Sequence, residues 1–542
     1  MAMSEAAIPA AGREGRSGCA LLLGVLLILS GVLFLAQNLF AVSLLPLFRQ
    51  ALLLFIDYWP VLLVLWGASK IYQRFAHPAQ ARVGAFEVVL LLFLVLCGLS
   101  LSAARRALER VSGEKLEDLI GFSSASFLGA PAHVFPSEAH FEIGAASGLA
   151  IHNPGGQVRI QGGDGPSIEV SIEKRVRHES ADEASAIADK VKLEFDASGP
   201  TARLSVALPE GATPIESDLA VRLPRNLAVS VENRRGRVTA LDLQGAVRIE
   251  TAHEGIEAEN LDGGLEATTR HGDIRVRSIA GTVQLVSRGG SVLAENVKGD
   301  LRAETSQGRL VAEDVSGKAT LENRHAPIEA ARIGGDLSVT AQNADVSVET
   351  ALASVVVASR HGSIFVRDVR GNLTVEAMNA PIQVRDVAGD VRIENRDEGV
   401  TLVGVRGAAR VISPLSSVTV EDVQGPVEIE SSHEDVRVLA FGSNLTVRST
   451  HAPLKVSTDR LAGSVVLKTT YGDVELKLPR GASLSFEGLS EDGELHSSFP
   501  DLEIAEDHRG AQSVFRGARG SSPHKIQVET SYGDIRLEPS ES

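Results

Sequence analysis

Histidine recurs at one position of an 18-residue repeat, and imidazole is the side chain here best suited to ligate a metal or to change charge near neutral pH. The six histidines at this position are His253, His271, His325, His361, His433 and His451. If each repeat is one coil of a stack, with about 4.8 Å between neighbouring strands, His253 lies beside His271 and His433 beside His451. The possible chemistry is a shared metal ion or a pH-sensitive ladder.

The residue types at the same position can also be explained by backbone structure alone, without metal binding or a change of charge. Other repeats carry Gly289, Asn343 or Asp397 there. Glycine, asparagine, aspartate and histidine are the residues that tolerate left-handed backbone at a tight turn. A metal site also needs a third or fourth ligand with supporting partners, and no separate ligand motif is present. We therefore favour a turn over a metal site, and expect no cofactor.

The elements that would position these histidines are indicated by glycines of the same period. Residues at one fixed spacing are typical of a solenoid, in which each repeat is a coil stacked on the next. The two gaps in the series hold small residues, Ala353 and Ser443. The ten glycines, which we predict to be structural turn residues, are Gly245, Gly263, Gly281, Gly299, Gly317, Gly335, Gly371, Gly389, Gly407 and Gly425.

The apolar residues identify the kind of solenoid. Pairs of apolar residues two apart begin two positions after each glycine, as at Val247 and Ile249, and recur nine positions later, as at Ile256 and Ala258. Alternation with period two, rich in Val and Ile, predicts strands. Polar residues between them would face outward. The sequence therefore predicts an all-β, parallel β-helix-like solenoid with two short strands in each 18-residue coil.

The predicted solenoid occupies residues 236–479, about thirteen coils and on the order of 60 Å in length. Each end of such a stack needs a cap, because its strand edges would otherwise be unpaired. We expect an N-terminal β cap at 139–235 with one helix near 179–192. We expect a C-terminal cap and tail at 480–542, with a loop at 507–524.

The first part of the chain is predicted to lie in a membrane. After an N-terminal tail at 1–18, the region 19–104 contains three nearly uncharged apolar runs, at about 19–40, 51–69 and 86–103. Each is close to the ~20 residues that cross a bilayer as a helix. A cleaved signal peptide is the alternative for the first run, but the run is long and no cleavage site follows it. Residues 105–138 would be a linker.

Basic residues beside these runs are divided evenly between the two sides of the membrane. One set, favouring a cytoplasmic N-terminus, is Arg13, Arg16, Lys70, Arg74 and Arg82, and the opposing set is Arg49, Arg105, Arg106, Arg110 and Lys115. We expect an integral protein of the inner, cytoplasmic membrane with an extracytoplasmic solenoid, because a short basic N-terminal segment is usually cytoplasmic.

The composition disfavours several classes of ligand and activity. The net charge of −16 disfavours nucleic acid, and an aromatic content of 4% disfavours stacking on sugar rings. Both cysteines, Cys19 and Cys97, fall in or beside the apolar runs, so the solenoid has no disulfide. Coils of constant length leave no long loops to form a catalytic pocket, and catalytic motifs are absent. We expect no enzyme, with a polysaccharide-active enzyme on a β-helix as the minor alternative.

Two segments resemble known families. Leu23–Leu35 followed by Asp57–Gly67 resembles the LiaI/LiaF-like (DUF5668-type) transmembrane region of bacterial envelope-stress proteins. The repeated Gly-Asp-Ile/Val strands, with the closing Ser531-Tyr532-Gly533-Asp534-Ile535, resemble the DUF4097 family of adhesin-like toastrack β-domains. Together the resemblances cover most of the chain. They imply a membrane-anchored scaffold or sensor at the cell envelope and carry no catalytic residues.

These observations favour a non-enzymatic interaction, scaffold or sensing module at the bacterial envelope, with a role in envelope-stress signalling. Its expected partners are the lipid bilayer and a membrane or envelope protein, and self-association is open. The alternative is a surface adhesin or polymer-binding rod. The two differ in where they bind: a membrane partner would engage 19–104, whereas an adhesin would bind through the solenoid alone.

Overall fold

The computed structural model describes residues 131–209, 215–509, 512–521 and 524–540. The three predicted membrane spans, at 19–40, 51–69 and 86–103, lie outside these residues. Among the described residues, no helix has the length and apolar character needed to cross a bilayer. The solenoid lies in a compact unit formed by Val134–Arg175 and Ala188–Ser542.

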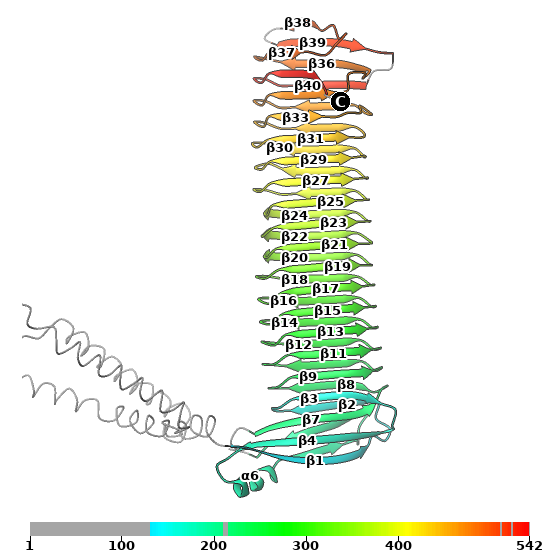
Figure 1. The fold of residues 1–542 in the computed structure, drawn as a ribbon, viewed down its shortest axis with the longest axis vertical. Coiled ribbons are helices and arrows are strands. Elements are labelled where there is room, and N and C mark those ends of the chain that lie inside the picture. Colours follow the sequence, from blue (N-terminus) through cyan, green and yellow to red (C-terminus); the bar gives the residue numbers. More distant parts are fainter. Residues whose placement is uncertain (1–130, 210–214, 510–511, 522–523, 541–542) are drawn as a thin grey trace, which may run out of the picture. The chain divides into compact units, whose positions relative to one another are not determined.

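The unit is built of fourteen regular coils, each of which contributes one strand to each of two parallel sheets (Figure 1). Sheet 1 contains β8 (Ala228–Asn233), β10 (Val247–Thr251), β12 (Leu265–Thr269), β14 (Val283–Ser287), β16 (Leu301–Thr305), β18 (Ala319–Asn323), β20 (Leu337–Asn343), β22 (Val355–His361), β24 (Leu373–Asn379), β26 (Val391–Glu394), β28 (Ala409–Ser413), β30 (Val427–Ser431), β32 (Leu445–Arg448) and β34 (Val465–Lys468).

Sheet 2 is formed by the strands that alternate with these along the chain. They are β9 (Val238–Leu243), β11 (Ile256–Leu261), β13 (Ile274–Ile279), β15 (Val292–Val297), β17 (Leu310–Val315), β19 (Ile328–Ile333), β21 (Val346–Ala351), β23 (Ile364–Val369), β25 (Ile382–Val387), β27 (Val400–Val405), β29 (Val418–Val423), β31 (Val436–Phe441), β33 (Leu454–Ser457) and β35 (Val474–Leu478). The prediction of a parallel β-solenoid with two strands per coil is confirmed.

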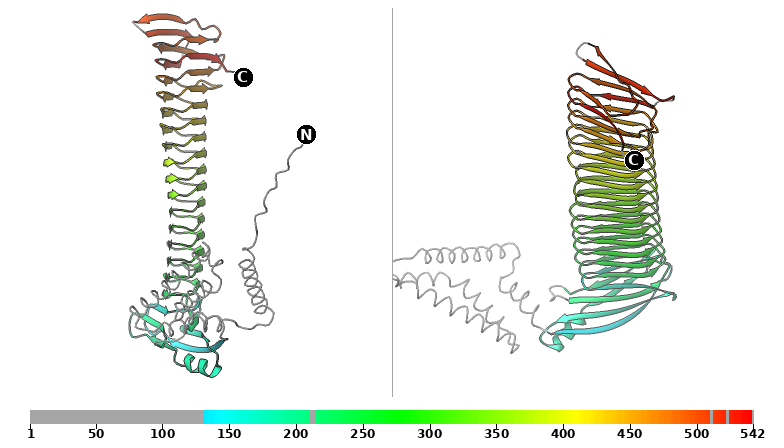
Figure 2. Two further views of the ribbon diagram at one scale, coloured as in Figure 1. Left: turned by 90° about the vertical axis from the view of Figure 1, so that its left-hand side faces the viewer. Right: turned by 45° about the horizontal axis from the view of Figure 1, so that its top comes forward.

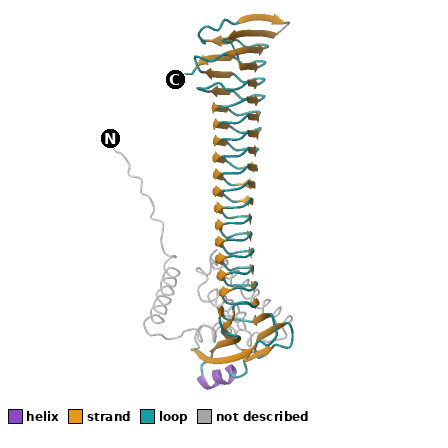
Figure 3. Ribbon diagram, turned by 90° about the vertical axis from the view of Figure 1, so that its right-hand side faces the viewer, coloured by secondary structure: helices purple, strands orange, loops and turns teal. Residues whose placement is uncertain are grey.

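The register of the sheets follows the repeat. Val247 pairs with Leu265 and Ile249 with Ala267, an offset of one coil. Each pair therefore places apolar residues in the narrow core between the sheets, where Ile249 is 0% exposed. Full burial of an aliphatic side chain contributes about 1.5–3 kcal/mol, so the core gains similar stabilisation at every coil. Viewed from the side, strands stack in two columns joined by short loops (Figure 3).

At the N-terminal end, the order of coils in space differs from their order in the chain. β2 (Gly148–Asn153) and β3 (Val158–Gly163) pair with β8 and β9 on one side. On their other side they pair with β6 (Thr201–Ala207) and β7 (Ile215–Pro224), which come later in sequence. The coil β2–β3 is thus enclosed between two coils synthesised after it.

The remaining N-terminal elements close the sheets. β4 (Ser167–Arg177) pairs with β7 and with β1 (Ala132–Glu142). β5 (Lys192–Asp196) pairs antiparallel with β6, so the last strand of sheet 1 is not a parallel coil strand. The helix expected near 179–192 is α6 (Ala181–Ala188).

The C-terminal end shows the same kind of rearrangement. β40 (His524–Glu529) and β41 (Ile535–Pro539) pair with β34 and β35 on one side. Their other neighbours are β36 (Leu484–Ser490) and β37 (Leu495–Ser497), which precede them in sequence. The late strand β40 consequently lies below β36, β38 and β39, which form the tip, as Figure 1 shows, and the same order of colours is seen in Figure 2.

The expected loop at 507–524 is wrong. β38 (Ala505–Arg509) and β39 (Gln512–Arg519) form an antiparallel hairpin, and β39 also pairs antiparallel with β36. Glycine and serine around this segment suggested a loop. The pairing instead follows from burial of Val514 and Phe515, 2% and 5% exposed, against the final coil. The outermost strand β38 carries Glu506 and Asp507, and charged edge strands resist further pairing.

Two kinds of turn connect the sheets. The glycine edge joins a sheet 2 strand to the next sheet 1 strand, as from β11 to β12 through Gly263. The histidine edge joins a sheet 1 strand to the following sheet 2 strand, as from β10 to β11 through His253. The two edges run along opposite sides of every regular coil.

On the glycine edge, close backbone contact demands glycine. A Cβ atom on Gly299 would lie 2.3 Å from the carbonyl oxygen of Gly281, and a Cβ on Gly389 would lie 2.4 Å from that of Gly371. Three positions before each repeat glycine, the backbone is left-handed, as at Asp242 (φ 57°) and Asn296 (φ 55°). Short polar side chains and glycine meet these two requirements at the lowest cost.

Candidate functional site

The histidine edge brings the repeated rings together in two stacks. The imidazoles of His253 and His271 lie with ring centroids 5.5 Å apart and planes within 13° of each other. His433 stacks on His451 at 5.0 Å. The second stack continues through Tyr471 at 4.9 Å from His451 and Tyr532 at 5.1 Å from Tyr471. Four rings therefore form one row across four successive coils.

The other two histidines have no ring partner among the described residues. His361 ends β22, and its Nδ1 lies 3.3 Å from the side-chain nitrogen of Asn379 on β24. His325 lies in the turn between β18 and β19, where its backbone N–H donates to the carbonyl oxygen of Ser306. The six residues thus share an edge without forming one continuous cluster.

The surroundings of the first stack do not resemble a metal centre. A hollow of about 230 Å³ is lined by both histidines and by charged side chains. Two of the three carboxylates in it are paired with arginine, Glu257 with Arg237 at 3.1 Å and Asp273 with Arg275 at 3.1 Å, and the third is Glu254. Within the described part of the chain, no three His, Cys, Asp or Glu residues are grouped so as to hold a metal ion.

The histidine position lies at the turn between the two sheets, but the left-handed backbone expected there does not occur at the histidines. None of the six histidines has a positive φ, and the left-handed non-glycine residues of the regular coils lie on the glycine edge, whereas on the histidine edge a positive φ occurs at glycine, as at Gly362 (φ 104°). The histidine edge instead turns on a row of small polar residues inside the corner. The Ser287 hydroxyl donates to the carbonyl oxygen of Gly272 in the preceding coil at 3.0 Å, and accepts from Gly290 N–H at 3.0 Å.

Sequence reasoning missed this internal polar row, although its residues also recur every 18 positions. Ser287 is 2% exposed and Thr269 1%, so their hydroxyls bond in a dry environment. Each links its own turn to the coil before it and satisfies backbone groups that the strands leave unpaired. The buried residues at this corner also include Thr251 and Ser431, whose hydroxyls have no hydrogen-bond partner within the described residues; the full set is Asn233, Thr251, Thr269, Ser287, Thr305, Asn323, Ser359, Asn395, Ser413, Ser431, Thr469 and Thr530.

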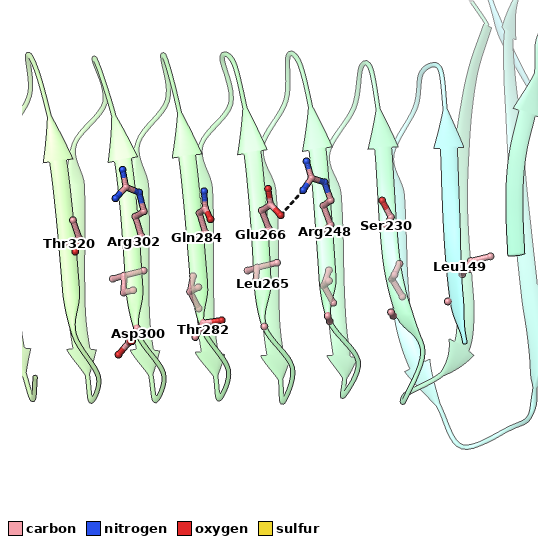
Figure 4. A pocket seen from close by; sticks show the side chains of 18 of the residues that line it. Leu149, Ser230, Arg248, Leu265, Glu266, Thr282, Gln284, Asp300, Arg302 and Thr320 are labelled. Carbon is pink, nitrogen blue, oxygen red and sulfur yellow. Dashed lines mark hydrogen bonds and ion pairs between the residues drawn. The ribbon is translucent and has the colours of Figure 1, made fainter. Parts of the chain in front are cut away.

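A shallow groove crosses the outer face of sheet 1. It spans β2 to β18 with a volume of about 710 Å³. Figure 4 shows its outward side chains in one row, from Ser230 past Arg248 and Glu266 to Arg302 (Figure 4). Arg248 donates to Glu266 at 2.6 Å across one coil. A second hollow of about 530 Å³ lies in the same phase between β24 and β32.

Charged side chains on the strand faces are mostly paired with one another. Arg277 donates to Glu295 at 2.8 Å, Arg367 to Glu349 at 2.9 Å, and Arg410 to Glu428 at 2.8 Å. Exposed pairs of this kind contribute about 0–1 kcal/mol each. Their effect is to neutralise both strand faces locally and to favour the one-coil register.

Two carboxylates show how the environment lowers a pKa on each edge. On the glycine edge, hydrogen bonding and the charge of Arg332 hold the pKa of Asp314 below its ordinary value. On the histidine edge, the pKa of Asp345 is lowered by hydrogen bonds from the backbone N–H and the hydroxyl of Ser363. The first effect depends on an ion pair and the second on neutral donors.

The arrangement supports contact with a partner over many coils. The hollows are open, lie on strand faces or turns, and are lined by side chains that repeat from coil to coil. Such surfaces offer a row of equivalent binding positions, which suits an elongated partner better than a small molecule.

Comparison with known proteins gives a family. No curated protein matches this chain. Two solved structures are similar: a "putative cell adhesion protein" from Clostridium sporogenes (7% identity, TM-score 0.19, covering 75% of this chain and 100% of that one) and a "putative adhesin" from Parabacteroides distasonis (11%, 0.16, 63% and 97%). The family model described as Toastrack DUF4097 matches residues 149–538, from β2 to β41. Since this match spans more than half of the chain, the protein belongs to the DUF4097 toastrack family.

Proposed function

We propose that this protein is a non-enzymatic, membrane-anchored interaction module of the bacterial cell envelope, acting as a scaffold or sensor in envelope-stress signalling. The observation that carries the proposal is the regularity of the solenoid. Fourteen coils joined by short turns present continuous faces and edges, with open hollows in place of a deep pocket. Rigid repeat surfaces of this kind bind partners along their length.

The anchor is assigned from the sequence. The runs at about 19–40, 51–69 and 86–103 have the length and apolar character of membrane-spanning helices. Three spans place the two ends of the chain on opposite sides of the membrane. The proposed arrangement has a cytoplasmic N-terminus and an extracytoplasmic solenoid at the inner membrane. The resemblance of the first two runs to LiaI/LiaF-like regions favours a membrane protein as the signalling partner.

The test is protease accessibility of the solenoid in spheroplasts, using the full chain with an epitope tag after Ser542. Digestion of the tag in intact spheroplasts supports an extracytoplasmic solenoid. Protection that is lost on lysis contradicts the proposed side of the membrane. Recovery of the full chain in the soluble fraction after osmotic lysis contradicts the anchor itself. A cytoplasmic protein with the same tag reports whether the spheroplasts are sealed.

A second candidate, a surface adhesin or polymer-binding rod, is favoured by the long groove on sheet 1. The groove runs across successive coils from β2 to β18, as a site for an extended polymer would (Figure 4). Deletion of residues 19–104 distinguishes the two proposed functions. A rod that binds its target through the solenoid keeps binding after the deletion, whereas a module that engages a membrane partner through its spans loses it.

A further inference from the structure

The histidine edge carries a second periodic feature, a row of arginines immediately before the histidine position. Four of them, Arg288, Arg324, Arg360 and Arg396, follow one another at intervals of 36 residues, which is two coils. We call these four residues the arginine row. The corresponding positions of the coils between them hold uncharged residues, Ser306, Gln342 and Met378. Arg270 precedes the row by one coil.

These arginines differ from the many strand-face arginines that lie in ion pairs. All four side chains are exposed, and within the described residues their guanidinium groups make no hydrogen bond or ion pair. Strand-face arginines such as Arg277 and Arg367 are instead paired with glutamate from a neighbouring coil. The arginine row therefore leaves its charge available to a partner, which the paired arginines do not.

Two carboxylates near the row, Asp273 and Asp345, already have partners. Asp273 accepts from the N–H of Ser291 and pairs with Arg275. Asp345 accepts both the N–H and the hydroxyl of Ser363. At the C-terminal end of the row, Asp397 and Glu398 follow Arg396 and limit the basic stretch. The edge is consequently basic between Arg270 and Arg360, although the whole chain has a net charge of −16.

The geometry of the row selects the shape of a ligand. Neighbouring strands are about 4.8 Å apart, so arginines two coils apart recur about every 10 Å along a straight line. Guanidinium groups recognise carboxylates by bidentate hydrogen bonds, and this recognition does not need stacking rings. The electrostatic potential at the arginine row depends on the charges close to it rather than on the net charge of the whole chain.

We propose that the arginine row binds a linear acidic polysaccharide, a polyuronate whose alternate sugar residues present carboxylates to successive arginines. The proposal adds a ligand class to the proposed interaction function and rests on that function. The exposed histidines beside Arg324 and Arg360, His325 and His361, would contribute further donors to the sugar hydroxyls and carboxylates. An extended chain of this kind could contact all four arginines along seven coils.

The experiment measures binding of sodium polygalacturonate to the detergent-solubilised full chain by biolayer interferometry. The test variant carries Arg288→Gln, Arg324→Gln, Arg360→Gln and Arg396→Gln. The matched control carries Lys298→Gln, Lys318→Gln, Arg370→Gln and Arg406→Gln, four exposed cations of the glycine edge, and changes the net charge equally. Because the test variant can form none of the four exposed ion pairs with the polymer, its affinity should fall by on the order of thirtyfold. The affinity of the control should stay within about twofold of wild type.

A third variant with lysine at the same four positions keeps the charge and removes the bidentate geometry. It should bind with intermediate affinity, and it keeps the proposal testable if the glutamine variant fails to fold. Equal losses in the test and control variants would overturn the proposal, as would wild-type protein that does not bind polygalacturonate. Competition by single-stranded DNA at equal charge concentration would also overturn it, since recognition would then be of charge alone. Because binding is measured in detergent, its outcome is independent of the membrane side that the protease experiment tests.

Discussion

The two long edges of the solenoid turn the chain through similar angles by different physical means. The glycine edge relies on backbone: left-handed residues such as Asn296, followed three positions later by a glycine in contact with the previous coil. The histidine edge also has glycines in contact with the previous coil, such as Gly290, but adds buried side chains such as Ser287, whose hydroxyl ties its turn to the neighbouring one. The glycine edge repeats a glycine in almost every coil, whereas the residue types at the outer positions of the histidine edge vary from coil to coil.

The charge of the two edges follows the same division. The glycine edge places short acidic side chains at its left-handed and neighbouring positions, including Asp242, Asp262, Asp300, Asp314, Asp336, Asp368, Asp386 and Asp390. The histidine edge has no such requirement outside the corner and carries exposed arginine, histidine and tyrosine. Between Arg270 and Arg360 a partner would therefore meet an acidic side and a basic side of the same coils, whereas exposed carboxylates such as Glu254 and Glu434 add negative charge to the histidine edge outside that stretch.

The largest difference is expected when a methyl group is added at the close-packed Gly299 and at the outer position Gly289. Gly299→Ala would set a Cβ 2.3 Å from the backbone of the preceding coil, and neither backbone can move away cheaply. Gly289→Ala on the histidine edge would meet its nearest atom, the carbonyl oxygen of Arg270, at 3.3 Å. We expect Gly299→Ala to destabilise by about 2–4 kcal/mol and Gly289→Ala by less than about 1 kcal/mol.

Hydrogen exchange of the amides in β14 and β16, together with the urea midpoint, measures this difference. A solenoid distributes stability over nearest-neighbour interfaces, so the Gly299 variant should exchange faster in the adjacent coils first. Similar effects of the two substitutions would show that the outer position at Gly289 is as constrained as Gly299, although it lies beside the close-packed Gly290, and would remove the distinction between outer and close-packed positions.

A smaller effect is expected from the internal polar row. Ser287→Ala removes a hydroxyl that both donates and accepts in a buried corner, and should cost about 1–3 kcal/mol. Ser230→Ala makes the same chemical change on the exposed face of β8 and serves as the control. Ser287→Thr should retain stability, since Thr269 and Thr305 occupy equivalent positions. Thermal unfolding followed by circular dichroism distinguishes the three; a neutral Ser287→Ala would mean that water replaces the hydroxyl.

The smallest expected effect concerns pH and salt. Because the pKa values of Asp314 and Asp345 are lowered in the folded protein, each adds stability that is present above about pH 4 and is lost as the pH falls through the lowered value. High salt screens the Arg332 pair of Asp314 but acts weakly on the Ser363 donors of Asp345. At about 0.5 M salt, Asp314→Asn should therefore no longer alter the acid dependence of the unfolding midpoint, whereas Asp345→Asn still should. Equal salt sensitivity of the two variants would contradict the assignment of causes.

Local periodicity was sufficient to predict the regular coils and insufficient at their ends. Val247 pairs with Leu265 because the repeat places like residues 18 positions apart, and that spacing is visible in the sequence. Leu149 pairs with Val229 and with Ala202, separations that occur once and leave no pattern. One signal was available: Tyr532-Gly533-Asp534 echoes Tyr471-Gly472-Asp473, and these two turns do stack.

The candidate site, too, could be predicted only in part. The period was enough to align His253 with His271, since stacking of coils aligns equivalent positions. It could not reveal which edge places non-glycine residues in the left-handed conformation, because aspartate, asparagine and glycine occur on both edges. Nor could it show that the guanidinium groups of Arg324 and Arg360 are unpaired within the described residues, which depends on whether glutamate lies within reach in the surrounding coils.

The coil enclosed at the C-terminal end makes the fold sensitive to the length of its own chain. Strands β40 and β41 come after β36 and β37 in sequence, yet they fill a place inside the stack, between β35 and β37. A chain that stops before Ile526 therefore leaves a gap between two formed layers instead of a shorter stack. Only a polypeptide that extends through β41 can join the hairpin at the tip to the regular coils, so the fold distinguishes a chain synthesised to that point from one released too early.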